Sequence, residues 1–335
     1  MTNHYQEHPF AQFIRVLGKG KKGSRSLTHE EAYAAMSMIM DNKVEPVQLG
    51  AFLMLMRVKE ESAEELAGFV KAARDSFEQP GQSISVDLGW SSYAGKRRHL
   101  PWFLLSALLL ADNNIGVFMH GASGHSAHRI YTEDILPLFG IKPARSFQES
   151  ANQLKQNHFS YLSLKHFCPK LNEMIELRRL MGLRSPVHTL ARMLNPLHAK
   201  ASIQGIFHPG YRPVHQQAAL LLDDNITVFR GEGGEAERNP DVDTLVQSVE
   251  RGTMVDEQWP ALFKRRHIKP KHLDPSDLVY IWQGAKKDEY GESAIISTAA
   301  IALKALGKID NQKHALDLAR EFWQTRAKQK YHTVS

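Results

Sequence analysis

The chain is poor in cysteine, with Cys168 as the single example among 335 residues. One thiol cannot form an intramolecular disulfide, and it excludes a zinc site built on several thiolates. Because free cysteine behaves as a small apolar residue, we expect Cys168 to be buried. The sequence also has no apolar run of about 18 residues and no charged leader followed by an apolar stretch. We therefore expect a cytoplasmic protein that does not enter a membrane.

The motifs of several common sites are also missing. There is no Walker-type phosphate loop, no Gly-x-Ser-x-Gly nucleophile motif and no cysteine–histidine pattern. The 17 histidines show no metal-binding spacing. We expect no metal, no cofactor and no catalytic residue. Helix-turn-helix, zinc-finger and RNA-recognition signatures are absent too, so sequence-specific readout of a nucleic acid is not expected.

Positive charge, in contrast, is plentiful: the formal net charge is +6 and the sequence pI is about 9.2. Much of it falls into short clusters, which include residues 19–25, 96–98 and 264–271. A single cluster of this kind is usually solvated surface. Several clusters on one chain favour an anionic partner.

Helical patterns dominate the first 75 residues. Phe10, Phe13, Ile14 and Leu17 recur at the spacing of one helix face. Two capping boxes follow, Thr28–Glu31 and Ser62–Glu65, and each predicts a helix start. Pro46 suits the first turn of a further helix between them. These four short helices carry more apolar surface than they can bury alone.

After a Gly- and Pro-containing linker near residues 79–82, the pattern changes to α/β. Strand-like segments occur near 84–88, 115–119, 159–164, 202–207 and 226–230, with helical patterns between most of them. This alternation predicts a mainly parallel sheet. The segment 89–99 lies between the first strand and an apolar helix. A loop in that place is where ligands bind in a doubly wound sheet, and here it carries three consecutive cations.

Several stretches resemble the anthranilate phosphoribosyltransferase family. They are residues 48–54 and 64–69 in the helical part, the run from Asp87 to His120-Gly121, and Arg178–Arg184 followed by Asn195-Pro196. The resemblance implies a small helical domain, residues 1–75 with 170–198, which forms a homodimer. It implies a larger α/β domain made of residues 76–169 with 199–335. In the family, the position of Arg184 meets the carboxylate of the aromatic substrate.

The substrate motifs of that family are degraded in this sequence. Where the family has a Gly-Thr-Gly-Gly-Asp turn, the chain reads Gly89-Trp90-Ser91-Ser92-Tyr93. Its Lys-His-Gly-Asn motif is replaced by Met119-His120-Gly121-Ala122, and its metal-binding Asp-Glu pair by Glu235-Ala236. A one-residue shift would bring Glu237 into the pair. The resemblance therefore implies lost phosphoribosyl transfer, and the alternative is a phosphoribosyltransferase with an altered substrate.

The chain is most similar to a YbiB-like branch of the family, whose members keep the fold and the dimer. Members of this branch lack the substrate motifs and bind DNA and RNA without marked sequence preference, so the resemblance implies single- and double-stranded DNA and RNA as partners. We expect cations on two walls of a cleft, 96–98 on one and 19–25 on the other, with Trp90, Tyr93 and Trp102 beside them for base stacking. The cations expected to contact phosphate are Lys19, Lys21, Lys22, Arg25, Lys96, Arg97, Arg98, Arg178, Arg184, Lys264, Arg265, Arg266, Lys269 and Lys271.

Overall fold

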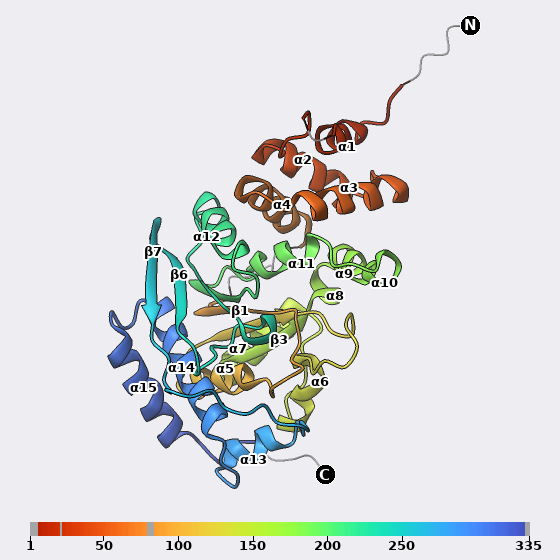
Figure 1. Cartoon of the computed structure of the whole chain (residues 1–335). Helices are drawn as coiled ribbons and strands as arrows, with labels where there is room; N and C mark the ends of the chain where they lie inside the picture. The colour runs from red at the N-terminus through yellow and green to blue at the C-terminus, as the bar shows by residue number, and fades with distance from the viewer. Residues whose placement is uncertain (1–5, 21, 79–83, 332–335) are drawn as a thin grey trace, which may run out of the picture.

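Four helices form a bundle at the N-terminal end of the molecule (Figure 1). They are α1 (Ala11–Gly18), α2 (His29–Met40), α3 (Pro46–Lys59) and α4 (Ala63–Ser76). Both predicted capping boxes are present, with the Glu31 amide donating to Thr28 Oγ1 and the Glu65 amide to Ser62 Oγ. The computed structural model describes residues 6–20, 22–78 and 84–331.

Seven strands form one sheet in the order β3–β2–β1–β4–β5–β6–β7. The first five are parallel, β6 runs antiparallel to β5, and β7 runs antiparallel to β6. The chain order reverses between β1 and β4, which is the switch point where ligands bind in open α/β sheets. The strands are β1 (Leu88–Ser92), β2 (Val117–Gly121), β3 (Phe159–Ser163), β4 (Ala201–Gly205), β5 (Ile226–Phe229), β6 (Thr244–Glu250) and β7 (Thr253–Trp259).

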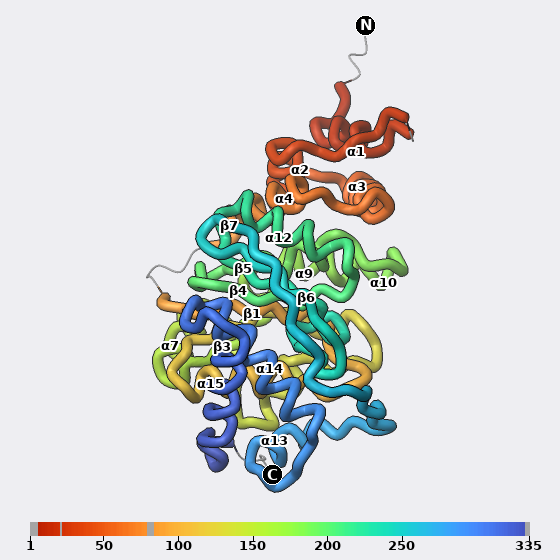
Figure 2. The backbone as a smooth tube through the Cα atoms, turned by 60° about the vertical axis from the view of Figure 1, so that its left-hand side comes forward, coloured from red at the N-terminus to blue at the C-terminus, as the bar shows by residue number. Residues whose placement is uncertain are grey.

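Helices cover both faces of this sheet. Figures 1 and 2 show α9, α10 and α12 between the bundle and the sheet, and α13, α14 and α15 on the far side. The helices beyond the bundle are α5 (Trp102–Asp112), α6 (Thr132–Ile135), α7 (Phe147–Asn157), α8 (Leu164–Phe167), α9 (Pro169–Glu176), α10 (Arg178–Met181), α11 (Val187–Leu190), α12 (Tyr211–Leu221), α13 (Asp277–Gln283), α14 (Glu289–Ala305) and α15 (Gln312–Thr325).

Two apolar cores follow from the alternation of side chains along the strands. In β2, Phe118 joins the core that continues into the bundle, whereas Val117 and Met119 join the core under α5 and α14. The first core includes Phe69 of α4 and Leu171 of α9, so the bundle and the sheet share buried contacts. Cys168 is buried there, as expected.

The predicted fold class, a small helical domain with a mainly parallel α/β domain, is confirmed. The division into residues 1–75 with 170–198 and 76–169 with 199–335 stays a prediction, although α11 does pack against α4. Within the described part of the chain, no helix combines the length and apolarity that a membrane crossing requires.

The structure differs from the sequence pattern at three places. The first strand begins at Leu88 instead of 84, so Gly89–Ser92 is strand and not a turn. The segment 171–197 does not form one continuous helix: Gly182 adopts a left-handed conformation with φ of 70° and Pro186 follows, which separates α10 from α11. The β6–β7 hairpin was not expected. Its second strand is largely exposed and polar, so it lacks the apolar pattern of the buried strands.

Candidate nucleic-acid interface

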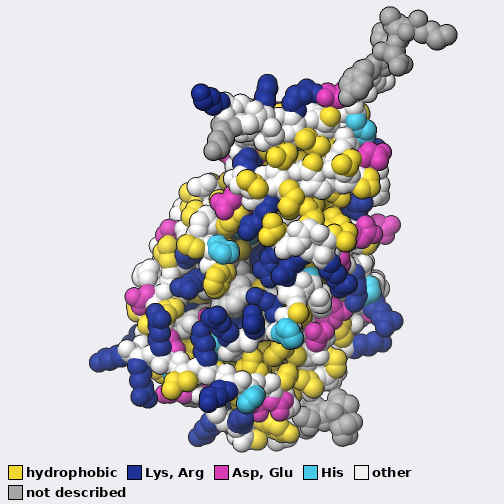
Figure 3. All heavy atoms as spheres, turned by 45° about the vertical axis from the view of Figure 1, so that its right-hand side comes forward, with side chains coloured by type: hydrophobic (Ala, Val, Ile, Leu, Met, Phe, Trp, Pro, Cys, Tyr) yellow, Lys and Arg dark blue, Asp and Glu magenta, His cyan; other side chains and the backbone are white. Residues whose placement is uncertain are grey.

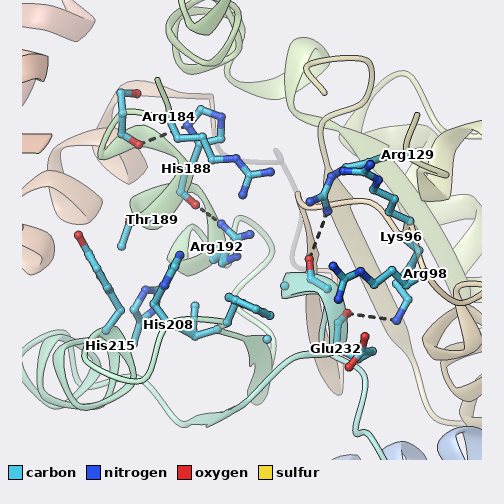
Figure 4. A pocket seen from close by; sticks show the side chains of 18 of the residues that line it. Lys96, Arg98, Arg129, Arg184, His188, Thr189, Arg192, His208, His215 and Glu232 are labelled. Carbon is cyan, nitrogen blue, oxygen red and sulfur yellow. Dashed lines mark hydrogen bonds between the residues drawn. The ribbon is translucent and has the colours of Figure 1, made fainter. Parts of the chain in front are cut away.

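A cavity of about 420 Å³ lies at the carboxyl ends of β1, β4 and β5. Residues 96–98 follow β1, residues 205–208 end and follow β4, and residues 232–234 follow β5. The opposite side is lined by Arg57 of α3 and by residues 184–192 around α11. The cavity therefore sits at the switch point of the sheet and is closed on one side by the helical elements (Figure 4).

Positive charge dominates the lining. Glu232 is the one acidic residue among the described residues that line the cavity. Figure 3 shows the face of the molecule that carries the cavity. Lysine and arginine side chains gather around the hollow in the middle of this face and continue below it. A concave surface with one sign of charge focuses the electrostatic potential and attracts anions. The lining cations are Arg57, Lys96, Arg97, Arg98, Arg129, Arg184 and Arg192.

Arg129 and Arg184 in the lining form no ion pair within the described residues. Arg184 has no hydrogen-bond or ion-pair partner within the described residues. Burial lowers the pKa of Arg184 to about 10, and the charges of Arg192, Arg129 and Arg178 act in the same direction. Arg129 is held by carbonyl oxygens, at 3.0 Å from Ala94 and 2.8 Å from Gly95. These contacts fix the guanidinium without neutralising it, so the group is prepared for an external anion.

Lys96 differs from the exposed cation that the sequence suggested. Its side chain is 1% exposed, and its Nζ lies 2.5 Å from Glu237 Oε1 and 3.1 Å from the Glu232 carbonyl oxygen. Arg97 and Arg98, the next two residues, are exposed and have no acidic partner in the described structure. The three adjacent cations therefore divide into one that joins two loops inside the protein and two that face the cavity.

Glu235 and Glu237, the candidate metal-binding carboxylates, are bound by the protein itself. Glu235 Oε1 accepts hydrogen bonds from the amides of Ala94 and Gly95 at 2.7 and 2.6 Å. Glu237 pairs with Lys96 and also accepts from the Phe103 amide at 3.0 Å. Both side chains are fully buried. The protein itself binds Glu235 Oε1 and the Glu237 carboxylate, whereas Glu235 Oε2 is buried without a hydrogen-bond partner in the described residues.

Close backbone packing holds this arrangement in place. A Cβ atom at Gly205 or at Gly231 would lie 2.1 Å from the carbonyl oxygen of Glu235, far inside van der Waals contact. Only glycine fits at these two positions, which lets the loop after β5 rest on the end of β4. This packing directs Glu235 toward the amides after β1 instead of toward the cavity.

The expected wall at residues 19–25 is not part of the cavity. Lys19, Lys22 and Arg25 are exposed, and none of them lines it. Arg25 is bound by Glu31 through two hydrogen bonds of 2.6 and 2.7 Å. Lys21 lies outside the described residues. The helical side of the cavity is instead supplied by Arg57 and by the arginines around α11, because α3 and α11 are the elements that face the sheet there.

Arg178 stands behind the cavity without lining it. It donates to the carbonyl oxygen of His125 at 2.9 Å and to Ser126 Oγ, so it anchors the loop after β2. Its charge nevertheless contributes to the lowered pKa of Arg184.

The cluster at 264–271 extends the basic surface. Its five cations, Lys264, Arg265, Arg266, Lys269 and Lys271, are all exposed in the loop before α13. A row of rings joins this loop to the rim of the cavity. His99 stacks on Tyr290 with ring centroids 4.3 Å apart, and Tyr290 meets His267 at 5.7 Å. His99 directly follows Arg98, and His267 lies within the loop 264–271. The ring contacts through Tyr290 therefore connect the two exposed groups of cations.

The aromatic residues expected to stack on bases are buried. Trp90, Tyr93 and Trp102 are 0–3% exposed and belong to the cores. Among the aromatic residues that line the cavity, Phe207 is 51% exposed and follows β4. The prediction of base stacking rested on the closeness of these aromatics to cations in the sequence. It failed because the large side chains of the strand and of the first helical turn point into the core.

Several lining residues were not predicted from the sequence: Arg57, Arg129, Arg192, His188 and His208. They are isolated in sequence and converge only through the fold. Only a weak sequence signal points to Arg192, namely its position one helical stretch after the segment Arg178–Arg184. His188 carried none; His125, whose ring centroid lies 5.4 Å from that of His188, is not among the lining residues. Burial lowers the pKa of His125 to about 4 and the pKa of His188 well below its usual value, so both are neutral at pH 7.

Comparisons with known proteins fit this geometry. Residues 11–77 match the helical bundle domain of the glycosyl transferase family. The chain is 30% identical over 236 residues to an uncharacterised protein of Aquifex aeolicus, covering 70% of this chain and 72% of that protein. It is 26% identical over 251 residues to the uncharacterised protein YbiB of Escherichia coli, covering 73% and 78%. The anthranilate phosphoribosyltransferase structure from Thermus thermophilus superposes with a TM-score of 0.77 at 22% identity, over 95% and 94% of the two chains.

The chain belongs to the YbiB-like branch of the anthranilate phosphoribosyltransferase family. The positions that resemble the family's substrate motifs can now be placed. Tyr93, Met119 and Ala122 are buried, with the Tyr93 hydroxyl 2.8 Å from His120 Nδ1. Arg184 alone of the residues carried over from the family lines the cavity without a partner. The family fold is preserved, while the residues that stand in the place of its diphosphate turn are buried in strand β1 and just after it.

Proposed function

We propose that the protein binds single- and double-stranded DNA and RNA through the phosphate backbone, without reading sequence, and has lost phosphoribosyl transfer. The observation that carries this proposal is the lining of the cavity. Besides Lys96, which is paired with Glu237, six arginines line it against one acidic residue, and the two candidate metal carboxylates are buried. Phosphate contacts position a nucleic acid but carry no base information.

The exposed cations extend beyond one small-molecule pocket, which favours a polymer. Arg97 and Arg98 stand at the rim, and the ring contacts His99–Tyr290–His267 lead from them to the loop at 264–271. A backbone that leaves the cavity along this path meets further unpaired cations. A compact substrate would not need them.

The transferase alternative has less support. It requires a magnesium diphosphate site, and magnesium takes oxygen ligands, usually carboxylates. The carboxylate of Glu235 already accepts the two amides after β1, and Glu237 is neutralised by Lys96. A diphosphate would have to displace a buried internal carboxylate, so we expect neither magnesium-dependent binding nor turnover.

We also propose that the protein is a homodimer formed through the bundle. Helix α3 carries an apolar stripe that no other described element covers, with Val47 at 78% and Val58 at 86% exposure. Ala51 lies between them on the same face. In a symmetric dimer, this stripe would be buried against the same stripe of the second subunit. Such two-fold symmetric dimers are the commonest oligomers.

Fluorescence anisotropy with labelled oligonucleotides tests the binding proposal. Single- and double-stranded DNA and RNA of two unrelated sequences are titrated at several salt concentrations. We expect nearly equal affinities for the two sequences and a steep loss of affinity with salt. No binding to any of them, or binding that ignores salt, would refute the proposal.

A further inference from the structure

The cavity is more strongly cationic at its base than a single backbone phosphate requires. Arg184 lies among Arg129, Arg178 and Arg192 without an acidic partner in the described residues. Clustered guanidinium groups repel one another, and burial lowers the pKa of Arg184 to about 10. An arrangement of this kind is stabilised when a compact ligand brings more than one negative charge into it.

Nucleic acids carry such a group only at a strand end. An internal phosphodiester has one negative charge, whereas a terminal phosphate monoester carries about −1.5 to −2 near pH 7. It also offers three oxygens as acceptors, and arginine recognises such groups through two parallel hydrogen bonds. The charge at the base of the cavity therefore matches a chain end better than a chain interior.

The size of the cavity supports the same conclusion. Its volume of about 420 Å³ is in the range of small-molecule sites, which is enough for roughly one nucleotide. A duplex cannot enter a space of this size. Phe207, half exposed beside the opening, offers a surface for one base.

Two buried polar groups in the lining also lack partners. Ser185 Oγ and His188 Nε2 have no hydrogen bond within the described structure, and their residues are 6% and 5% exposed. His188 Nδ1 lies 3.3 Å from the Ser185 carbonyl oxygen, so Nδ1 carries the proton and Nε2 is left as an acceptor. Buried polar groups are normally satisfied, and these two are placed to bond with a ligand.

We propose that the cavity binds the phosphorylated terminus of a single strand, with Arg184, Arg192 and Arg129 around the terminal phosphate and Arg97 and Arg98 on the following backbone. This inference rests on the proposed function and specifies which part of the polymer enters the cavity. Strand interiors then bind through the rim, and phosphorylated ends bind more tightly.

The test compares otherwise identical single strands of about 12 nucleotides, labelled on an internal base. They carry a 5′-phosphate, a 3′-phosphate or hydroxyl groups at both ends. We expect one or both phosphorylated strands to bind about tenfold more tightly than the hydroxyl strand, from one to two added charge-assisted hydrogen bonds. Equal affinity of all three strands would overturn the inference but leave the proposed function intact. Failure of every strand to bind would refute the proposed function itself.

Two variants locate the effect. Arg184→Gln removes a cation that has no partner, so we expect the fold to be kept and the preference for phosphorylated ends to disappear. Lys155→Gln removes an exposed cation at the end of α7, away from the cavity, and serves as the control, with the preference unchanged. A preference that survives Arg184→Gln would overturn the assignment. Free thymidine 5′-monophosphate is then added as a competitor of the labelled strand. If it displaces that strand at the same concentration as an unlabelled phosphorylated strand does, the ligand is a free nucleotide and not a strand end.

Discussion

Replacing Arg97 and Arg98 together by alanine separates the proposed phosphate contacts from the structural role of their neighbour. Both side chains are exposed and have no acidic partner in the described residues. Lys96 is left in place because it is buried and paired with Glu237. Exposed substitutions of this kind change the free energy of unfolding by less than about 0.5 kcal/mol, so a change in binding reports on the interface.

The size of the effect follows from counter-ion release. Each phosphate contact on a single strand contributes about 0.7 to the slope of log affinity against log salt. With one contact per arginine, the double variant should have a slope shallower by about 1.4. This electrostatic contribution vanishes at about 1 M salt. At about 0.1 M salt, the affinity of the double variant should therefore be roughly 25-fold lower than that of the wild type.

The assay is anisotropy with a single-stranded oligonucleotide over a range of salt concentrations. Lys155→Ala with Lys308→Ala is the matched control. Lys155 lies at the end of α7 that leads into β3, and the charge of Lys308 acts on Asp87 just before β1, so both belong to the opposite edge of the sheet. The control removes the same charge and should leave the slope within about 0.3 of wild type. An equal loss in both variants would show that net charge, and not this cleft, governs binding.

Four further outcomes are expected. Lys96→Ala leaves Glu237 buried without its partner and should lower the free energy of unfolding in urea by about 3–5 kcal/mol; a change below about 1 would contradict the buried pair. Val47→Asp with Val58→Asp should convert a dimer into a 37.9 kDa species in sedimentation, and a wild type that already sediments as a monomer would refute the dimer. Calorimetry with phosphoribosyl diphosphate should show no magnesium-dependent binding, and turnover with anthranilate would revive the transferase. Finally, stability should be complete above pH 6.5 and fall toward pH 4, because burial lowers the pKa of the histidines and the unfolded chain takes up protons first. A histidine whose pKa falls to about 4 contributes a loss of about 2 kcal/mol at pH 5, and a flat profile would contradict this. The histidines concerned are His99, His120, His125, His188 and His215.

The fold was largely predictable because its signals are local or periodic. The capping boxes at Thr28 and Ser62 lie within four residues, and the buried strands are short apolar runs. The exception at β1 has a physical reason. Residues 84–88 and 88–92 are both apolar enough for a strand, and only pairing with β2 and β4 decides between them.

The site was predicted less well because it depends on contacts between distant segments. Lys96 and Arg97 are neighbours in sequence, yet one is buried against Glu237 and the other is exposed, and no local pattern separates them. Glu235 had to be placed next to the Ala94 amide, 141 residues away, before its role was clear. Arg57 and Arg192 converge on the cavity from different elements and form no cluster in sequence.

Photo-crosslinking tests the central claim most directly. A single strand with photoreactive bases is bound to the wild-type protein and irradiated, and the modified peptides are identified by mass spectrometry. We predict adducts in the segments that line and border the cavity, residues 96–98, 184–192 and 205–208. Adducts confined to the amino edge of the sheet or to the outer face of the bundle would contradict binding in this cavity.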